Sequence, residues 1–320
     1  MSFKPGAETG KANLDVFSET LVALGRHNKD VLVLTSDSRG SGKLTPFAEA
    51  LPEQIVEIGI AEQNLVAVAS GLASMGKVVF AVSPGSFLTA RALEQIKNDV
   101  CYSDHPVKLV AISSGVSYGA LGSTHHSIHD FAVMRAVHNC TIIVPADNFE
   151  TAQAVKAAAG MAHPVFLRFG KKPMPHLHRP GTNFEVGKSL LVRDGSDVAF
   201  IATGEAVLPA VLAAEELETL GISARVVSMH TLRPLDNEAV LKAANECRAI
   251  ITAEEHSCAG GLGEACASLL MQQGVSLPFK IVGFPDEDTV TGSQQEIFDH
   301  YGISRPGLAQ TAASLLNSDR

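Results

Sequence analysis

The sequence predicts an α/β protein with two consecutive parallel-sheet domains. Short runs of consecutive apolar residues recur along the chain, and such runs are typical of strands buried on both faces of a parallel sheet. Most of these runs are followed by a helical pattern, so repeated βα units with right-handed crossovers are expected. A stretch rich in proline and lysine at about 170–185 interrupts the alternation. It predicts a linker between one domain at 1–180 and another at 186–320.

The first domain alternates apolar strands with helices whose apolar residues fall on one side. In the first helix, Leu14, Phe17, Leu21 and Leu24 recur at helical spacing. Strands are expected at 31–34, 55–58, 78–82, 108–112, 141–144 and 165–168, and helices at 13–26, 61–75, 89–100, 130–136 and 149–161.

The second domain repeats the same alternation after the break. Proline and charge are so dense at 170–180 that no strand or helix is expected to continue through it. Strands are then expected at 198–201, 224–227, 249–252 and 279–282, and helices at 207–220, 238–245, 263–272 and 305–316.

Composition excludes several classes of partner. The net charge is −9, and no run of lysine and arginine exceeds two residues, which argues against a nucleic-acid or anionic-membrane surface. No apolar run approaches the roughly 18–20 residues of a membrane span. The segment Met1–Gly10 is polar and lacks a signal core, and the five cysteines include no CxxC pair. We therefore expect a soluble, cytoplasmic protein.

The segment around Glu62 combines a strand, a turn and a helix. The β-branched run 55–58 ends at Gly59, which permits a tight turn, and a helix follows. Glu62 lies three residues before Leu65 and so heads the inward apolar stripe of that helix. A carboxylate in that position is costly unless a partner meets it. It is either a paired functional group or a first-turn glutamate that the helix dipole favours.

Four loops follow strands of the first domain, at 35–42, 59–62, 83–87 and 113–129. Ligands of parallel α/β sheets bind beyond the carboxyl ends of the strands. The last loop carries His125, His126 and His129. The i, i+4 spacing of His125 and His129 is compatible with zinc, but no HExxH motif and no nearby cysteine supports a metal. A surface cluster, or imidazoles presented to a polar substrate, are the interpretations left open.

Three blocks of the first domain resemble the pyrimidine-binding domain of thiamine-diphosphate enzymes. They are Gly59-Ile60-Ala61-Glu62-Gln63-Asn64, Ser86-Phe87 leading to Glu94–Asp99, and Gly122-Ser123-Thr124-His125-His126. Their order and spacing are similar to those in the C-terminal half of transketolase. The second domain resembles the transketolase C-terminal domain through 231–236 and 254–263. The resemblance implies a pyrimidine-binding fold followed by a transketolase C-terminal-like domain.

The resemblance also implies a cofactor, thiamine diphosphate. In the family, a carboxylic acid bonds to N1′ of the aminopyrimidine, and the cofactor's own imino group then removes the proton from C2 of the thiazolium. Glu62 matches that acid, and shielding from water suits it to exchange a proton near neutral pH. Phe87 matches the residue that stacks on the pyrimidine, although simple core packing is the alternative. Gln63 belongs to the same cofactor-binding block.

Substrate contacts are implied in the same way. His125 matches a histidine that contacts the oxygens of the donor sugar, so it is assigned a catalytic as well as a binding role. His126 occupies the position of the histidine in beta chains of 2-oxo acid dehydrogenases. Arg168 matches an arginine that holds a substrate phosphate, with a surface ion pair as the alternative. Ser41 aligns with a phosphate-contacting serine.

The sequence departs from the family at sugar-binding positions. Leu121 replaces an aspartate, Ser113 replaces a histidine, and a phosphate-gripping arginine aligns near Gly10. We therefore expect a non-standard ketose donor or aldehyde acceptor, with Arg168 and Lys171–Lys172 as the remaining handles for an anion.

The family's diphosphate and Mg²⁺ are bound by a separate domain that carries Gly-Asp-Gly followed by an Asn, and this chain has no such pattern. Gly195-Ser196-Asp197 precedes a second-domain strand and does not fit. We therefore expect the small subunit of a split transketolase that binds the pyrimidine end alone and has no metal ligands. A large subunit would supply the diphosphate domain and the Mg²⁺, in an α2β2-type assembly with active sites between chains.

Three rival interpretations stay open. The chain is alternatively the beta subunit of a 2-oxo acid dehydrogenase, a 1-deoxyxylulose-phosphate-synthase-like enzyme, or a non-catalytic scaffold subunit. The Thr124-His125 pattern and the Glu94–Asp99 block favour transketolase over the dehydrogenase. Retention of Glu62, Phe87 and His125 together argues against a scaffold.

Overall fold

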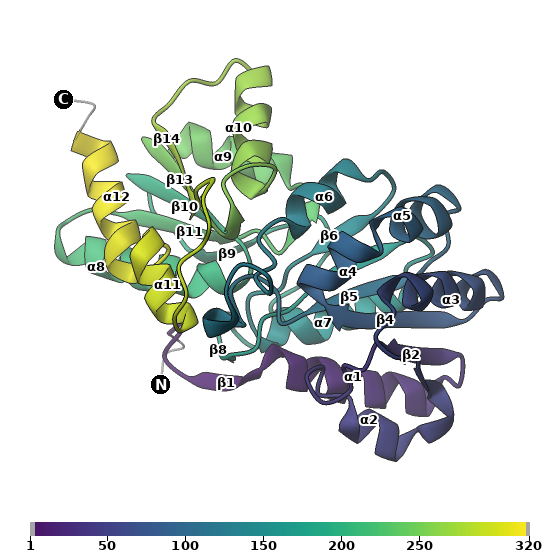
Figure 1. The fold of residues 1–320 in the computed structure, drawn as a ribbon. Coiled ribbons are helices and arrows are strands. Elements are labelled where there is room, and N and C mark those ends of the chain that lie inside the picture. The colour runs from purple at the N-terminus through teal and green to yellow at the C-terminus, as the bar shows by residue number, and fades with distance from the viewer. Residues whose placement is uncertain (1–3, 318–320) are drawn as a thin grey trace.

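The apolar runs of the first half form a seven-stranded sheet. A computed structural model describes residues 4–317 and places this sheet on the right of Figure 1. The strand order is β12-β6-β7-β5-β4-β2-β3, and all neighbours are parallel except the β12–β6 pair. The strands are β2 (Val31–Thr35), β3 (Ile55–Glu57), β4 (Val78–Pro84), β5 (Lys108–Ile112), β6 (Thr141–Ile143), β7 (Val165–Arg168) and β12 (Thr231–Arg233).

Helices cover both faces of this sheet because its strands are apolar on both faces. In β4, Phe80 and Val82 pack with α1, α2 and α7, whereas Val79 and Ala81 pack on the other side with α3, α4 and α6. The expected α/β architecture is therefore confirmed for the first half. The helices are α1 (Asn13–His27), α2 (Thr45–Ala50), α3 (Glu62–Ser74), α4 (Gly85–Arg91), α5 (Leu93–Gln95), α6 (Asp130–Ala136) and α7 (Asn148–Gly160), with short 3₁₀ turns at Pro52–Gln54 and Gly119–Leu121.

The helix expected at 89–100 differs from the prediction. It begins four residues earlier, at Gly85, and is interrupted at Ala92, directly after the end of α4. A short helix α5 follows, and the chain then widens into a π-helical turn, η2 (Ile96–Tyr102). Leu88, Ile96 and Val100 still reach one buried face, so the break changes the geometry while the apolar pattern is kept.

The second half forms a five-stranded sheet of order β14-β13-β10-β11-β9, on the left of Figure 1. All its pairs are parallel except β9–β11. The strands are β9 (Leu190–Arg193), β10 (Val198–Ala202), β11 (Ala224–Ser228), β13 (Ala249–Ser257) and β14 (Phe279–Phe284). The helices are α8 (Val207–Thr219), α9 (Asn237–Glu246), α10 (Leu262–Gln272), α11 (Gln294–Tyr301) and α12 (Arg305–Asn317), with a 3₁₀ turn at Gly204–Ala206.

The segment between the halves holds more structure than expected. Within the stretch predicted to be free of strands, β8 (Pro173–Pro175) pairs with β1 (Thr9–Ala12) as an antiparallel ribbon. Proline is tolerated there because the ribbon has only two strands, so each has an edge that needs no donor. Met174 and Leu177 are buried. The linker is therefore packed against the body of the protein.

The second half also completes the first sheet. Strand β12 adds to β6, which joins a segment beyond residue 186 to the first sheet. The hydrophobic pattern missed β12 because it has three residues, Thr231–Arg233, and one of them is charged. The two halves are thus interlocked through the backbone as well as through side chains.

Candidate active site

Four segments with polar residues lie at one edge of the first sheet. Strands β3, β2, β4 and β5 are consecutive neighbours and run parallel, so their carboxyl ends lie side by side. The segments that follow these ends carry Glu62, Ser41, Phe87 and His125. This is the edge at which open α/β sheets bind ligands.

Glu62 is buried at the start of helix α3, with its side chain 4% exposed. The turn before it needs Gly59, whose φ of +81° is strained for residues with a Cβ. Both carboxylate oxygens accept from Nη1 of Arg91, at 3.2 and 3.1 Å. Glu62 is therefore a paired, inward-facing carboxylate that also lies at a helix N-terminus, where a negative charge is favoured.

A pocket of about 500 Å³ opens beside this carboxylate. Its lining residues are Ile60, Ala61, Glu62, Gln63, Asn64 and Arg91. Ile60 is 74% exposed, and Gln63 and Asn64 are exposed as well. A buried acid thus lies at the base of a hollow whose rim is open to a ligand or to another chain.

Phe87, His125 and Tyr118 form a row of rings beside Glu62. Phe87 and His125 meet edge to face with centroids 5.4 Å apart, and His125 and Tyr118 do the same at 5.6 Å. A cation lies at each end of this aromatic row. Cζ of Arg91 is 4.6 Å from the centre of Phe87, and Nζ of Lys171 is 4.6 Å from the centre of Tyr118.

The imidazole of His125 faces the site. Its Nδ1 is 3.0 Å from Oγ1 of the neighbouring Thr124, which fixes the ring orientation. Among the described residues, Nε2 of His125 has no protein partner. That nitrogen is free to contact an oxygen of a substrate.

His126, expected to bind substrate, makes its contacts inside the protein. Its side chain is buried, Nδ1 lies 2.6 Å from Oγ1 of Thr289, and Nε2 donates to the carbonyl of Gly119 at 2.9 Å. Burial lowers the pKa of His126, which favours the neutral ring. His126 therefore fastens the site loop to the second half of the chain.

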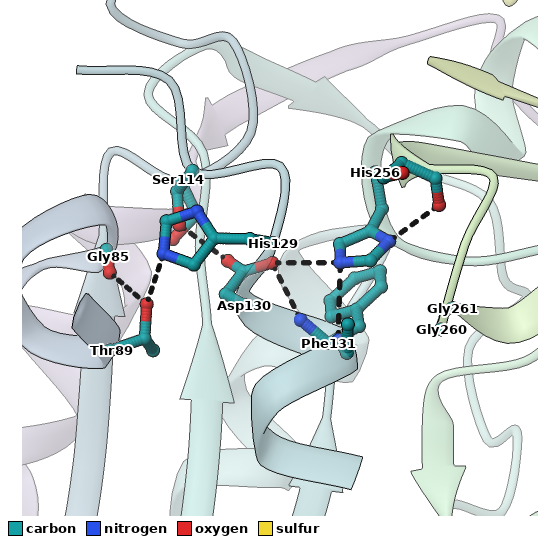
Figure 2. A network of polar contacts seen from close by, with 12 residues as sticks. Gly85, Thr89, Ser114, His129, Asp130, Phe131, His256, Gly260 and Gly261 are labelled. Atoms are coloured by element: carbon teal, nitrogen blue, oxygen red, sulfur yellow. Dashed lines mark hydrogen bonds and ion pairs between the residues drawn. The ribbon is translucent and has the colours of Figure 1, made fainter. Parts of the chain in front are cut away.

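The third histidine, His129, has a separate environment again. Its Nε2 is 3.1 Å from Oγ1 of Thr89, which itself donates to the carbonyl of Gly85 (Figure 2). His129 thus ties the histidine loop to helix α4, the helix that carries Phe87. Within residues 4–317, no group of three His, Cys, Asp or Glu side chains is placed to hold a metal ion.

Arg168 also departs from its expected role. The side chain is 3% exposed, and Nε donates to Oδ2 of Asp130 at 2.8 Å. Nη2 donates to the carbonyls of Ser127 and Glu255, at 3.2 and 2.8 Å, and Nη1 lies 3.5 Å from Oε2 of Glu255. The guanidinium is therefore bound to groups inside the protein, and it has no free pair of N–H donors for a substrate phosphate.

Arg168, Asp130, Glu255 and His256 form a buried group, the Arg168 cluster. This cluster joins the two halves of the chain. Figure 2 shows Asp130 at the start of α6 with His256 of β13 approaching it, and the ring of His256 stacks on Phe131 at 4.6 Å. Burial, with the nearby Glu205 as a second cause, raises the pKa of Glu255 to about 8. Burial lowers the pKa of His256 to about 4. The cluster is a structural junction behind the site.

Ser41 lies in the loop after β2, where its hydroxyl donates to the carbonyl of Ser38 at 3.2 Å. The backbone N–H of Gly42 donates to the same carbonyl at 2.8 Å. Ser41 is half-buried and holds this loop closed. The structure brings Glu62, Gln63, Phe87 and His125 together, and it leaves Ser41 as a loop residue whose substrate contact is still a prediction.

These residues fit the pyrimidine end of thiamine diphosphate. A buried carboxylate at a pocket is the group required to bond to a ring nitrogen, and the half-buried ring of Phe87 lies beside it. The two are bridged by Arg91, which contacts both. Glu62 and Phe87 would hold the aminopyrimidine.

Comparisons with known proteins agree with this fold. Residues 10–175 match the family "Transketolase, pyrimidine binding domain", and residues 187–308 match "Transketolase, C-terminal domain". The chain therefore belongs to the transketolase family and corresponds to its C-terminal half.

Relatives of the same length point to separate subunits. A protein of Phocaeicola vulgatus named as a subunit of an apulose-4-phosphate transketolase is 44% identical over 92% of this chain and 95% of its own. A 6-deoxy-6-sulfo-D-fructose transketolase subunit of a Clostridium species is 32% identical over 93% and 92%. A solved structure described as a split gene transketolase, inactive beta4 tetramer, is 36% identical with a TM-score of 0.87, covering 97% of this chain and all of that one.

Sequence reasoning missed two residues of the site. Arg91 lies four residues after Phe87, so one helical turn places both on the same side of α4, and that spacing was a usable signal. Tyr118 gave no such signal, because the loop geometry that brings it against His125 is set by positive-φ glycines at 115, 119 and 122.

Proposed function

We propose that the chain is the small subunit of a thiamine-diphosphate-dependent transketolase that moves a two-carbon ketol unit between sugars. The observation that carries the proposal is the meeting of Glu62, Phe87 and His125 at one sheet edge of a transketolase-family fold. Thiamine diphosphate supplies the carbon nucleophile of ketol transfer. Two relatives that match this chain over nearly their whole length are named transketolase subunits, which supports the same activity.

Each residue of the site has a distinct task in this proposal. Glu62 exchanges a proton with N1′ of the aminopyrimidine from a position shielded from water. Phe87 stacks on the pyrimidine ring, and Gln63 borders it from the pocket rim. His125, with Nε2 free, bonds to hydroxyl or carbonyl oxygens of the sugar next to the cofactor.

Lys171 is the handle for an anionic substrate in this proposal. The guanidinium of Arg168 is paired with Asp130 and Glu255. Lys171, in contrast, is exposed, and its ammonium lies over the ring of Tyr118. That ring contacts His125. A sugar that extends from the cofactor past His125 would bring its charged end towards Lys171.

The substrate is a non-standard sugar in this proposal. Leu121 is 54% exposed in the site loop, where it offers an apolar surface in place of a hydroxyl-binding group. The relatives named for apulose 4-phosphate and for a sulfonated fructose act on unusual anionic sugars according to their names. Ordinary xylulose 5-phosphate and ribose 5-phosphate are therefore expected to be inferior substrates.

A partner chain completes the active site. The sequence has no diphosphate-binding element, and the pocket at Glu62 is open at a rim that includes the exposed Ile60. A large subunit would hold the diphosphate and the Mg²⁺ and would close this pocket in an α2β2-type assembly. We place the complex in the cytoplasm, which suits five free cysteines. Within the described part of the chain, no helix is long and apolar enough to cross a membrane.

The test is to assay ketol transfer by the purified chain alone, by the large subunit alone, and by their mixture with thiamine diphosphate and Mg²⁺. We expect transfer in the mixture and none in either chain alone. Full activity of the small chain by itself would contradict the proposal. Release of CO2 from 2-oxo acids by the mixture would instead favour the dehydrogenase interpretation.

A further inference from the structure

We propose that Arg91 stands in for the aminopyrimidine and must leave Glu62 before the cofactor binds. The inference rests on the proposed function, because it takes Glu62 and Phe87 as the pyrimidine-binding residues. It adds a positioning residue that controls when those two groups are accessible. The three sequence motifs that resemble the family do not include Arg91 and assign it no role.

The contacts of Arg91 are those expected of the cofactor's ring. Its Nη1 donates to both oxygens of Glu62, at 3.2 and 3.1 Å, so it lies centred in front of the carboxylate. Its Cζ lies 4.6 Å from the centre of the Phe87 ring, over the face of that ring. A planar, nitrogen-rich guanidinium thus makes the same carboxylate and aromatic contacts as an aminopyrimidine would make. The two groups compete for the same atoms.

Arg91 is placed so that it can move away. Its side chain is 53% exposed although its partner Glu62 is only 4% exposed. It is the last residue of α4, and the helix is broken at Ala92 directly after it. Among the described residues, the guanidinium has hydrogen bonds and an ion pair with Glu62 alone and a cation–π contact with Phe87 alone. An outward rotation would therefore break contacts with two residues and leave the core intact.

Arg168 shows what a fixed arginine looks like in the same protein. Its guanidinium is 3% exposed and is held by Asp130, by Ser127 and by two groups of Glu255. Arg91 has a single ionic partner and is half in solvent. The contrast assigns Arg168 to the framework and Arg91 to a reversible contact.

Competition by Arg91 has a measurable consequence for affinity. A ligand that binds only the open form shows an apparent dissociation constant raised by the inverse of the open fraction. If Arg91 occupies Glu62 in nine molecules of ten, its removal tightens cofactor binding about tenfold. A residue that merely held Glu62 in a productive position would give the opposite sign, because its removal would weaken binding.

The experiment is calorimetric titration of thiamine diphosphate, at saturating Mg²⁺, into the complex of this chain with its large subunit. The variants are Arg91→Ala and Arg91→Lys, and the control is Arg26→Ala, which removes the same charge from an exposed position on α1. We expect the dissociation constant to fall about tenfold in Arg91→Ala. A smaller fall is expected in Arg91→Lys, whose ammonium pairs with Glu62 but cannot lie flat on Phe87. We expect no change in the control.

Three outcomes would overturn the inference. A dissociation constant that is unchanged or higher in Arg91→Ala, while wild type binds, shows that Arg91 does not compete with the cofactor and overturns the inference alone. If the dissociation constant falls equally in Arg26→Ala, the loss of one positive charge explains the effect. No binding by wild type and variants alike overturns the proposed function together with the inference. Melting curves confirm that each variant is folded.

Discussion

Phe87 and His125 meet edge to face with their ring centroids 5.4 Å apart. Phe87 comes from the helix after β4, and His125 from the loop after the neighbouring strand β5. The contact brings the residue assigned to the cofactor ring against the residue assigned to the sugar. Under the proposed function, the spacing of the neighbouring strands β4 and β5 would set how far the sugar lies from the pyrimidine.

Replacement of Phe87 should weaken cofactor binding. We expect Phe87→Ala to raise the dissociation constant of thiamine diphosphate, because an offset aromatic contact adds about 0.5–1.5 kcal/mol beyond buried area. Calorimetry on the assembled complex measures the change. Tyr102→Leu, which alters an aromatic side chain that is 78% exposed, is the control and should leave the constant unchanged. Equal affinity in Phe87→Ala would mean that the ring serves core packing alone.

Substitutions of the adjacent residues His125 and His126 should have different effects, one on activity and the other on stability. We expect His125→Asn to lower kcat/KM for ketol transfer with little change in melting temperature. We expect His126→Ala to destabilise the fold, because two buried hydrogen-bond partners lose their contact, each at a cost of about 1–3 kcal/mol. Thermal melting and steady-state kinetics on both variants separate the roles. Matching losses of stability would show that His125 is also structural.

Lys171 should matter for charged substrates and Lys172 much less. We expect Lys171→Ala to raise KM for a phosphorylated sugar by about tenfold, equivalent to the loss of one charge-assisted contact worth ~1.4 kcal/mol. KM for an uncharged sugar should stay the same. Lys172→Ala is the matched control, since Lys172 is exposed and adjacent. An unchanged KM for the phosphorylated sugar in Lys171→Ala would place the anion site elsewhere.

The Arg168 cluster should make stability depend on pH. The pKa of Glu255 is raised to about 8 and that of Glu254 to about 7, mainly by burial, so the folded state holds protons that the unfolded state loses above about pH 4.5. Folding stability should therefore fall as pH rises towards 8, by roughly 2 kcal/mol between pH 6 and 8 for Glu255. The pKa of His256, lowered to about 4, acts with opposite sign and mainly below pH 6.5.

Glu255→Gln tests this linkage, because glutamine mimics the protonated carboxyl at every pH. We expect its unfolding free energy to fall less than that of the wild type between pH 6 and 8, measured by denaturant titration. Glu53→Gln, at an exposed position, should follow the wild-type profile. Parallel profiles for Glu255→Gln and wild type would show that the carboxyl is ionised throughout.

Much of the fold could be predicted from the sequence because apolar runs and helical spacing report burial directly. Strands β2, β5 and β7 lie within a residue of their expected ranges. The misses have physical causes. Of the four strands that were not expected, β9 (Leu190–Arg193) is an apolar run that the pattern missed. The other three, β1, β8 and β12, contain few apolar residues, and each pairs with a strand more than 80 residues away. Local pattern carries no information on such pairing.

The site could be predicted only where a family motif includes the residue. The motifs shared with the family include Glu62, Phe87 and His125, and the structure brings these three residues together. The buried position of Arg168 could not be predicted, because its two acidic partners come from α6 and β13, which the sequence does not place beside it. A residue's accessibility depends on long-range packing, so a motif match cannot show that its guanidinium is free.

The most direct measurement is ketol transfer by the assembled complex in which a Glu62→Gln chain replaces the wild-type chain, with Glu53→Gln as a surface control. We predict that the Glu62→Gln complex loses about 10²–10⁴-fold in turnover, because general acid–base catalysis contributes that much, while its melting temperature changes little. The control should keep full activity. Turnover by the Glu62→Gln complex within a factor of about two of wild type would contradict the assignment of Glu62 as the acid that meets the cofactor.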